Sequence, residues 1–390
     1  MIARALIPIL LLILLPDLYR EWRSRSRKKS RPLWRRLIAW LPSVAMTVFT
    51  VYMALQPGFA PGDMNLLFVY LFVLCLVFVP RLVYVLCSLA GRGVARLTHS
   101  RRNYGNLLGL LLVPLLWYVL IYGSTRGFSQ LEVRHVELAF SDLPPSFDGY
   151  RIVQFSDAHV GSYGLSRQHL LRRAVDSINA QQPDMIVFTG DLQNRHPQEL
   201  YPQIDVLSLL RAGDGVFSVL GNHDYAEYID ADEVTKTANC RETQSLERQM
   251  GWTLLMNAHR TLHRGNTDSI VIAGMENDGT ARRMPQRGDV ARTLAGVQPG
   301  AFVIMLQHDP TCWARKIQPE SNAQLTLSGH THGGQFALLG FAPVALAYNE
   351  FDGLYYKNGR MLYVTAGLGG LIPFRFGVPG EIVVITLRRK

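Results

Sequence analysis

Acidic residues are scarce in the first third of the chain. Residues 1–126 contain sixteen lysines and arginines but only three acids, Asp17, Glu21 and Asp63. The rest of the 390-residue chain holds 24 basic and 27 acidic residues, so the net charge of +10 arises entirely from the first third. The basic residues lie in short segments between apolar runs and do not cover a soluble domain. This pattern predicts a membrane domain and argues against nucleic-acid binding.

Cysteine is also scarce, with four residues in the whole chain. Cys75 and Cys87 fall within one apolar run, whereas Cys240 and Cys312 are widely spaced and form no metal-binding or redox motif. Cys240 and Cys312 could pair in an oxidising compartment or stay as two free thiols. Internal repeats and low-complexity segments are absent from the sequence as well.

Four apolar runs stand out in the first third: Ala5–Pro16, Leu37–Leu55, Leu66–Ala90 and Leu107–Tyr122. About twenty apolar residues are needed to cross ~30 Å of hydrocarbon, and the first run is short by that measure. It could be an uncleaved signal anchor, because no small-residue cleavage site follows it. We expect a membrane domain over residues 1–126 with about four transmembrane helices, roughly 2–19, 37–55, 65–89 and 105–123.

The basic residues of the loops predict the orientation of the chain in the membrane. Tyr19–Arg36 contains nine lysines and arginines and Gly91–Tyr104 contains four, whereas Gln56–Asp63 contains none. Short basic loops stay on the cytoplasmic side, so everything after about Arg126 should lie outside the cytoplasm. We therefore expect an integral protein of the inner (cell) membrane with an extracytoplasmic domain. Arg81, inside the third run, is expected to snorkel to the inner interface, with a functional intramembrane charge as the alternative.

Strand-like and helix-like segments alternate in the remaining two thirds, which predicts an α/β layered sandwich. We expect helices at Ser166–Gln181, with Ser166 as the N-cap, and at Gln198–Arg211. The expected strands are Tyr150–Phe155, Met185–Thr189, Gly215–Leu220, Trp252–Asn257, Ser269–Met275, Ala301–Leu306, Gln324–Leu327, Met361–Thr365 and Glu381–Leu387.

Metal-ligand residue types follow five of these strands. The candidate ligands are Asp157, His159, Asp191, Asn222, His308, His330 and His332. In open α/β sheets, ligands bind outside the carboxyl ends of the strands, so these side chains should converge. Glycines at 190, 221 and 329 precede the polar residues and would allow a tight turn and a close backbone approach. The remaining histidines lack such a context and are interpreted as solvated or structural: His99, His135, His169, His196, His259 and His263.

The number and type of these ligands indicate the metal. Seven nitrogen and oxygen ligands are too many for one tetrahedral zinc ion with an open position. They suit two divalent ions that share a carboxylate, and mixed imidazole and carboxylate ligands favour Mn, Fe or Zn over Ca or Mg. Two ions ~3.5–4 Å apart form a clamp for in-line displacement at phosphorus. The expected cofactor is therefore a pair of divalent metal ions.

In their order along the chain, these motifs resemble the calcineurin-like metallophosphoesterase superfamily. The matching residues are Asp157-x-His159, Gly190-Asp191, Gly221-Asn222-His223-Asp224, His308 and Gly329-His330-x-His332. The resemblance covers about Leu131 to Leu387 and looks closest to the membrane-associated or exported branch, because of the stretch "GLGGLIPFRFGVPGEIVVITL". It implies a four-layer α/β/β/α sandwich over residues 131–390, with the dimetal site between two sheets. It does not identify the substrate.

The resemblance also implies a role for each site residue. One ion would be held by Asp157, His159, Asp191 and His332, and the other by Asp191, Asn222, His308 and His330. A hydroxide between the ions would be the nucleophile, because metal binding lowers the pKa of water to roughly 7. His223 would face the phosphoryl group and assist the leaving oxygen, and Asp224 would orient His223.

The substrate class stays open at this level. Ala226–Gln249 is expected to be a polar insertion beside the mouth of the site. Phe336–Tyr356 is apolar and aromatic, and either suits a lipid-linked phosphate or forms a hairpin packed in the core. The expected function is a membrane-anchored dimetal phosphoesterase acting on a phosphodiester, monoester or pyrophosphate. Two alternatives are a non-catalytic metal-binding module of the cell envelope and a pyrophosphatase of nucleotide-linked lipids. The oligomeric state is not predicted.

Overall fold

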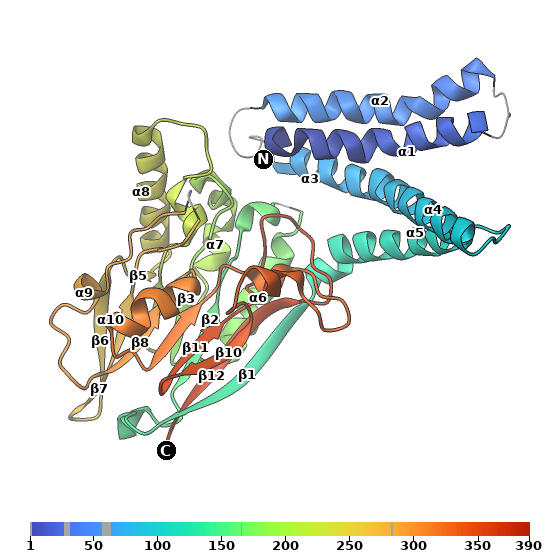
Figure 1. Ribbon diagram of the computed structural model, residues 1–390. Helices are drawn as coiled ribbons and strands as arrows, with labels where there is room; N and C mark the ends of the chain where they lie inside the picture. Colours follow the sequence, from blue (N-terminus) through green and yellow to red (C-terminus); the bar gives the residue numbers. More distant parts are fainter. Residues whose placement is uncertain (1, 27–31, 57–63, 165, 282–283) are drawn as a thin grey trace. The chain divides into compact units, whose positions relative to one another are not determined.

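The computed structural model describes residues 2–26, 32–56, 64–164, 166–281 and 284–390. The chain forms two compact units, Met1–Ser124 and Thr125–Lys390, which we describe separately. The first unit is helical, and the second combines strands with shorter helices (Figure 1).

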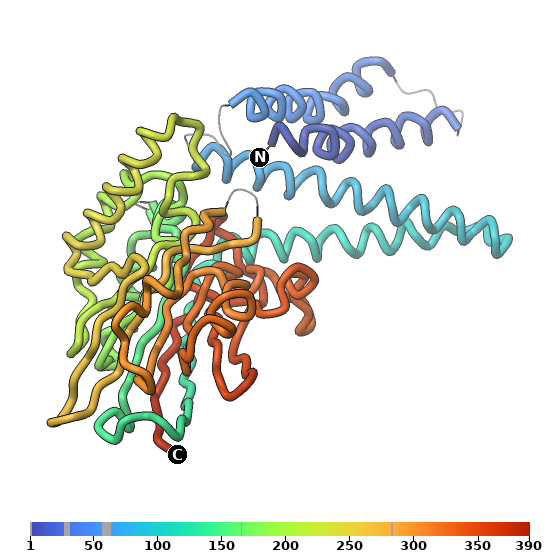
Figure 2. The backbone as a smooth tube through the Cα atoms, turned by 60° about the vertical axis from the view of Figure 1, so that its left-hand side comes forward, coloured from blue at the N-terminus to red at the C-terminus, as the bar shows by residue number. Residues whose placement is uncertain are grey.

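Long apolar helices make up the first unit. They are α1 (Leu6–Ser26), α2 (Leu33–Leu55), α3 (Met64–Val73), a π-helical turn (Leu74–Phe78), α4 (Val79–Leu97) and α5 (Tyr104–Tyr122). In both backbone views α1 lies beside α2 and α4 beside α5 (Figures 1 and 2). Four helical stretches are long and apolar enough to cross a membrane, including the first, which continues from Ile2 through Pro16 to Ser26. The predicted loop Gln56–Asp63 and part of Tyr19–Arg36 lie outside the described residues.

The guanidinium of Arg81, which was expected to snorkel to the inner interface, donates to the carboxylate of Asp17 and to Ser43 Oγ. The carboxylate of Asp17 also accepts a hydrogen bond from Ser43 and lies 3.0 Å from Arg20 Nη1. Asp17 is fully buried, so the helices enclose an ionic cluster that links α1, α2 and α4. Burial of an unpaired charge is far more costly than burial of a pair, which explains why Arg81 contacts Asp17.

The second unit contains two six-stranded sheets. Their orders are β1-β12-β2-β3-β4-β5 and β10-β11-β9-β8-β7-β6. The strands are β1 (Leu131–Phe140), β2 (Arg151–Phe155), β3 (Met185–Phe188), β4 (Val216–Ser218), β5 (Thr253–Leu254), β6 (Ala258–Arg264), β7 (Asp268–Gly274), β8 (Phe302–Leu306), β9 (Leu325–Ser328), β10 (Gly353–Lys357), β11 (Arg360–Val364) and β12 (Gly380–Arg389). β2 to β5 run parallel, as do β7, β8, β9 and β11, so each sheet gathers several strand ends at one edge.

Three apolar clusters define four layers. The central cluster joins the inner faces of both sheets and contains, for example, Val187 from β3 and Ile304 from β8. A second cluster packs α6 (Gln168–Ala180) on the outer face of the first sheet. A third packs short helices, including the turn at Trp313–Ile317, on the outer face of the second sheet. This arrangement is the expected α/β/β/α sandwich, and it follows from strands that are apolar on both faces.

Two local expectations were wrong. Ser166 does not cap a helix, because α6 begins at Gln168 after Arg167. The expected helix at Gln198–Arg211 consists of two 3₁₀ turns and the short α7 (Ile204–Leu207), since prolines at 197 and 202 cannot donate helical hydrogen bonds. The segment Ala226–Gln249, expected to be a polar insertion beside the mouth of the site, contains α8 (Glu233–Gln249), which buries one face in the fold.

Two more short helices, α9 (Val290–Thr293) and α10 (Gln318–Glu320), complete the second unit. Cys240 and Cys312 are both buried free thiols, so of the two open alternatives the structure shows the unpaired one.

Candidate metal centre

The predicted ligands converge where the parallel strands of both sheets end. Asp157 and His159 follow β2, Asp191 follows β3, and Asn222 follows β4 in the first sheet. His308 follows β8, and His330 and His332 follow β9 in the second sheet. The two sheets therefore supply different halves of one side-chain cluster, as the resemblance to the metallophosphoesterases implied.

Backbone strain is concentrated at this cluster. Five of the seven candidate ligands have positive φ angles: Asp157 at 51°, His159 at 45°, Asp191 at 60°, His330 at 74° and His332 at 54°. Non-glycine residues rarely adopt this region, and such strain tends to persist at functional sites. The strained turns at the strand ends direct the side chains toward one another.

Glycines let the two sheets approach at the centre. A Cβ atom at Gly329 would lie 2.0 Å from Ser156 Oγ and 2.3 Å from Asp157 Oδ2. A Cβ atom at Gly221 would lie 2.2 Å from Asp191 Oδ1. These glycines were expected to permit close approach to an ion, and in the structure they make room for the carboxylates themselves.

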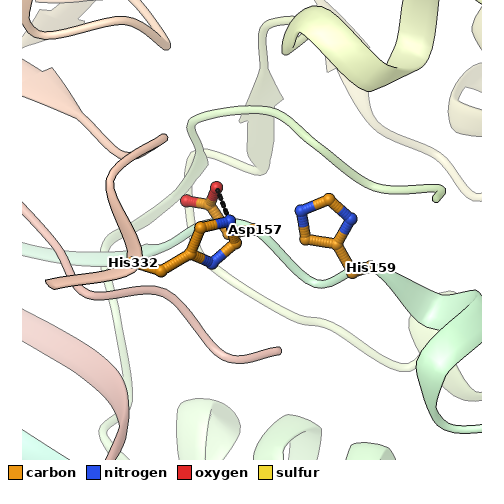
Figure 3. A group of neighbouring side chains, drawn as sticks. All are labelled: Asp157, His159 and His332. Carbon is orange, nitrogen blue, oxygen red and sulfur yellow. Dashed lines mark ion pairs between the residues drawn. The ribbon is translucent and has the colours of Figure 1, made fainter. Parts of the chain in front are cut away.

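Asp157, His159 and His332 form one potential metal-binding group (Figure 3). His332 Nε2 lies 3.5 Å from Asp157 Oδ1. The backbone amide of His330 donates to both carboxylate oxygens of Asp157, at 3.2 and 3.0 Å, which fixes the carboxylate toward the centre. The first sheet thus contributes two members of this group and the second sheet contributes one.

Asp191 lies between the two halves of the centre. Its Oδ2 is 3.5 Å from His159 Nε2 and 3.2 Å from His308 Nε2. His308 Nδ1 contacts the carbonyl oxygen of Thr189 at 2.7 Å, which directs Nε2 toward the carboxylate. Asp191, His308 and His330 form another potential metal-binding group. Of the predicted ligands, Asp191 is the one with histidines from both sheets around the same carboxylate oxygen.

Several buried ligand atoms have no hydrogen-bond partner among the described residues. They include both ring nitrogens of His159, Oδ1 of Asn222 and Nδ1 of His332. Such atoms are costly to bury unless another group satisfies them. Burial, followed by repulsion from His223, also lowers the pKa of His159 to about 3, so the imidazole is neutral and able to bind a cation. The residues present therefore fit a pair of divalent ions.

His223 forms a further potential metal-binding group with His159 and Asp191, and it is also held by contacts outside the ligands. Its Nδ1 lies 2.6 Å from the carbonyl oxygen of Asn194, and its ring packs against Tyr228 with centroids 4.4 Å apart. The expectation that Asp224 orients His223 is wrong. The carboxylate of Asp224 accepts backbone amides of the loop that begins at Asp191, and it also accepts the amide of Gly221. Asp224 thereby fixes the loop backbone, and the carbonyl of Asn194 orients the imidazole.

Further residues at the centre were not predicted from the sequence. Asp309 Oδ2 is buried, lies 3.9 Å from His330 Nε2 and has no hydrogen-bond partner among the described residues. Tyr348 Oη contacts His330 Nε2 at 3.1 Å, and Tyr228 Oη accepts from Asn222 Nδ2 at 2.9 Å. The only sequence signal for Asp309 is its position directly after His308. The tyrosines come from loops, and nothing in their local sequence links them to the metal ligands.

Arg375, the arginine of the stretch "PFRFG", holds a loop beside the metal centre. Its guanidinium is fully buried and donates to the carbonyl oxygens of Ala366, Gly367 and Gly369, with further contacts to those of Val378 and Pro379. The amide of Gly369 in turn donates to the carbonyl oxygen of Asp157 at 2.8 Å. Arg375 therefore holds the glycine-rich loop against the backbone that carries Asp157.

The segment Phe336–Tyr356 is exposed and does not pack in the core. Leu338, Leu339, Phe341 and Leu346 are 48, 99, 55 and 82% exposed, respectively. Their loop also carries Tyr348, which contacts the ligand His330. Of the two expectations for this segment, the packed hairpin is wrong. We refer to these four side chains as the apolar loop.

Comparisons with known proteins agree with this geometry. Residues 150–334 match the profile of the calcineurin-like phosphoesterases, and residues 3–128 match a profile described as "Probable Calcineurin-like phosphoesterase, transmembrane domain". The metallophosphoesterase YkuE of Bacillus subtilis is 33% identical over 278 residues, which cover 68% of this chain and 90% of that protein. A transmembrane protein with a metallophosphoesterase domain from Danio rerio is 32% identical over 291 residues, covering 73% of this chain and 62% of that protein.

A solved structure of a dimetal phosphatase from Danio rerio is also similar. It is 13% identical, has a TM-score of 0.33, and the match covers 58% of this chain and 89% of that chain. The sequence matches, and not this structural similarity, support the assignment. On those matches and the ligand groups described above, the chain belongs to the calcineurin-like metallophosphoesterases, a family of metal-dependent phosphoester hydrolases, and carries a transmembrane domain.

Proposed function

We propose that the second unit hydrolyses a phosphate ester with two divalent ions that share Asp191. Asp157, His159 and His332 would complete the ligands of one ion, and Asn222, His308 and His330 those of the other. The observation that carries this proposal is the position of the Asp191 carboxylate, within 3.5 Å of His159 and 3.2 Å of His308. Mn, Fe and Zn all suit these nitrogen and oxygen ligands.

When bound, the two ions would activate water and stabilise charge on the phosphoryl oxygens. The protein's own groups supply the remaining chemistry. The Nδ1 atom of His223 lies within hydrogen-bond distance of the carbonyl oxygen of Asn194, so Nδ1 is the donor. The other ring nitrogen, Nε2, faces away from this carbonyl. A protonated His223 can therefore donate from Nε2 to the leaving oxygen. Asp224 acts indirectly, because it holds the backbone around Asp191 through amide hydrogen bonds.

A specific observation supports a lipid-linked substrate. The apolar loop exposes Leu339 and Leu346 beside the centre, on a chain whose first unit spans the membrane. Burying one leucine in hydrocarbon contributes about 1.5–3 kcal/mol, so several such residues would bring the loop to a lipid surface. A phosphate ester attached to a lipid would then reach the centre without leaving the bilayer. The orientation proposed from the basic loops places this site outside the cytoplasm, at the inner membrane.

The activity is tested with the full-length chain in detergent, loaded with Mn and given a nitrophenyl phosphodiester and monoester. We expect hydrolysis that is lost in Asp191→Ala and retained in His259→Ala, a matched variant at a histidine outside the centre. A metal-loaded protein that hydrolyses neither ester nor a pyrophosphate would support the alternative, a non-catalytic metal-binding module. The buried unpartnered atoms fit either alternative, whereas His223 beside the ligands favours catalysis.

The lipid and orientation proposals have separate tests. Leu339→Ser with Leu346→Ser should lower hydrolysis of a lipid phosphate in vesicles about tenfold or more and leave hydrolysis of the soluble ester unchanged. Val234→Ser, at a 78% exposed valine of α8, is the matched control. Equal effects on both substrates would refute the lipid proposal. For orientation, alkaline phosphatase fused after Lys390 should be active; a fusion active only as a cytoplasmic reporter would favour the alternative of a cytoplasmic pyrophosphatase.

A further inference from the structure

A large cavity opens among the helices of the membrane unit. It has a volume of about 1010 Å³, at the top of the range of ~300–1,000 Å³ found for small-molecule sites. Its lining residues come from α1, the π-helical turn, α4 and α5. Nothing in the proposed hydrolysis uses it, because every residue that lines it belongs to the first unit.

The cavity is basic on one wall. Arg20, Arg23 and Arg81 all line it. Asp17, fully buried, contacts Arg20 and Arg81, and the other ion pair recorded for the described helices joins Glu21 to Arg36. Of the three guanidinium groups at the cavity, those of Arg20 and Arg81 share the carboxylate of Asp17, whereas Arg23 has no ion pair among the described residues. This leaves an excess of two positive charges between apolar helices.

Two of these arginines lack part of the charge or hydrogen-bond partners that a guanidinium group needs. Arg23 contacts neutral groups, Ser88 Oγ at 3.4 Å and Asn106 Oδ1 at 3.3 Å. Nη2 of Arg20 is buried and has no hydrogen-bond partner among the described residues. Uncompensated cations inside a membrane are costly, and such residues typically face a cavity and mark a binding site. Guanidinium groups bind phosphate in a bidentate manner, so the missing partner has the chemistry of a phosphate.

Another part of the cavity lining is apolar. It is formed by residues such as Leu76, Val77, Val113 and Ile121. Trp117 is fixed there by a hydrogen bond from Nε1 to the carbonyl oxygen of Leu76, at 2.8 Å, within the π-helical turn. π-helical turns are rare in proteins, and those that occur are often found at functional sites. An occupant must therefore combine a negative headgroup with hydrocarbon.

We propose that this cavity binds an anionic phospholipid, with its phosphate on Arg20 and Arg23 and an acyl chain along Val77 and Val113. Arg20 and Arg23 belong to the basic segment Tyr19–Arg36, where anionic headgroups of the cytoplasmic leaflet are expected. Basic pockets between membrane helices on that side are known to hold anionic headgroups. The site is independent of the metal centre and does not rest on the proposed hydrolysis.

The test measures lipid binding to the full-length chain in neutral detergent by native mass spectrometry. The probes are dioleoyl phosphatidylglycerol, dioleoyl phosphatidylcholine and inorganic phosphate. We expect phosphatidylglycerol to bind most tightly, and Arg20→Gln with Arg23→Gln to weaken it about tenfold or more, since charge-assisted hydrogen bonds are lost. Arg101→Gln with Arg102→Gln removes the same charge from exposed loop residues and should change the affinity less than twofold.

A second variant guards against a folding defect. Val77→Trp fills the cavity and leaves every arginine in place, so it should also abolish phosphatidylglycerol binding while the thermal unfolding midpoint stays near that of wild type. Equal affinity for phosphatidylcholine, or an equal loss in the Arg101→Gln with Arg102→Gln variant, would overturn the site. If inorganic phosphate binds as tightly as phosphatidylglycerol, the proposal that the occupant is a lipid would be overturned, and the cavity would be a simple anion site. Retained lipid binding in Val77→Trp would place the lipid elsewhere.

Discussion

The metal centre and the membrane cavity bury charged groups of opposite sign. At the centre, the carboxylates of Asp157 and Asp191 lie among imidazoles, and several ligand atoms have no protein partner. At the cavity, Arg20 and Arg81 share the carboxylate of Asp17, and Arg23 contacts only neutral groups among the described residues. Both sites use charge that the described side chains do not balance. The comparison teaches that the sign of the unbalanced charge predicts the ligand, which is a cation at the metal centre and an anion at the proposed lipid cavity.

The largest effect is expected at the carboxylate that both halves of the centre share. Asp191→Ala should remove both ions and all measurable activity together, because one side chain serves both ions. Metal analysis of the purified variant, run beside the hydrolysis assay, checks this. Asp205→Ala, in the short helix α7, is a control that should keep two ions per chain. Two retained ions in Asp191→Ala would end the assignment of a shared ligand.

A smaller effect is expected at His223, which we propose to be a catalytic acid and not a metal ligand. His223→Ala should keep the metal content and lower turnover about 10²–10⁴-fold, the usual range for a positioned acid or base. The loss should be smaller for nitrophenyl esters, because nitrophenol leaves without protonation. His330→Ala is the contrast, since it should lose metal and activity on every substrate. A uniform loss in His223→Ala for good and poor leaving groups would remove His223 from the catalytic residues.

The convergence of the candidate ligands could be predicted from the sequence because each follows an apolar strand, and parallel strands bring their ends together. The role of Asp224 could not be predicted from the sequence. A neighbour in sequence suggested a contact with His223, but the short turn after β4 directs the carboxylate to backbone amides 31 and 32 residues away. Tyr348 and Asn194 were missed for the same reason, since loops bring them to the centre. The strands β1, β6 and β10 were missed because their exposed residues interrupt an apolar pattern.

The membrane unit shows the same limit. Its spans follow from composition alone, whereas the partner of Arg81 depends on how the helices pack. Asp17 was visible as one of three acids in the first third, and its distance of 64 residues from Arg81 gave no sign of a contact. Chain topology therefore predicts where charges gather, and packing decides which of them pair.

The buried ion pair of the membrane unit gives the next prediction. Asp17→Ala leaves Arg20 and Arg81 without their carboxylate and should lower the free energy of unfolding by about 3–5 kcal/mol. Glu21→Ala, which breaks the more exposed pair with Arg36, should cost about 0–1 kcal/mol. Denaturation of the full-length chain in detergent, followed by tryptophan fluorescence, measures both. Similar losses for the two variants would mean that burial does not distinguish these pairs.

The last prediction concerns Glu247, whose carboxyl group has no ion pair within 4 Å among the described residues. Its side chain is fully buried in α8 and accepts a hydrogen bond from Ser218 at 2.5 Å. Burial, reinforced by Asp224, raises the pKa of Glu247 well above its ordinary value of 4.5, so a proton neutralises the folded carboxylate. The unfolded chain ionises at the ordinary value. Folding therefore becomes less favourable as the pH rises above about 4.5, by up to roughly 1.4 kcal/mol per pH unit, until the pH reaches the folded pKa.

Glu247→Gln removes this proton uptake and keeps the side-chain shape. It should match wild type in unfolding free energy near pH 4 and exceed it increasingly between pH 5 and pH 8, as measured by denaturant unfolding at each pH. Glu233→Gln, at a side chain of α8 that is 81% exposed, should follow wild type throughout. A difference between Glu247→Gln and wild type that does not grow with pH would show that Glu247 is ionised in the fold. An unseen cation would then have to balance it, as at the metal centre.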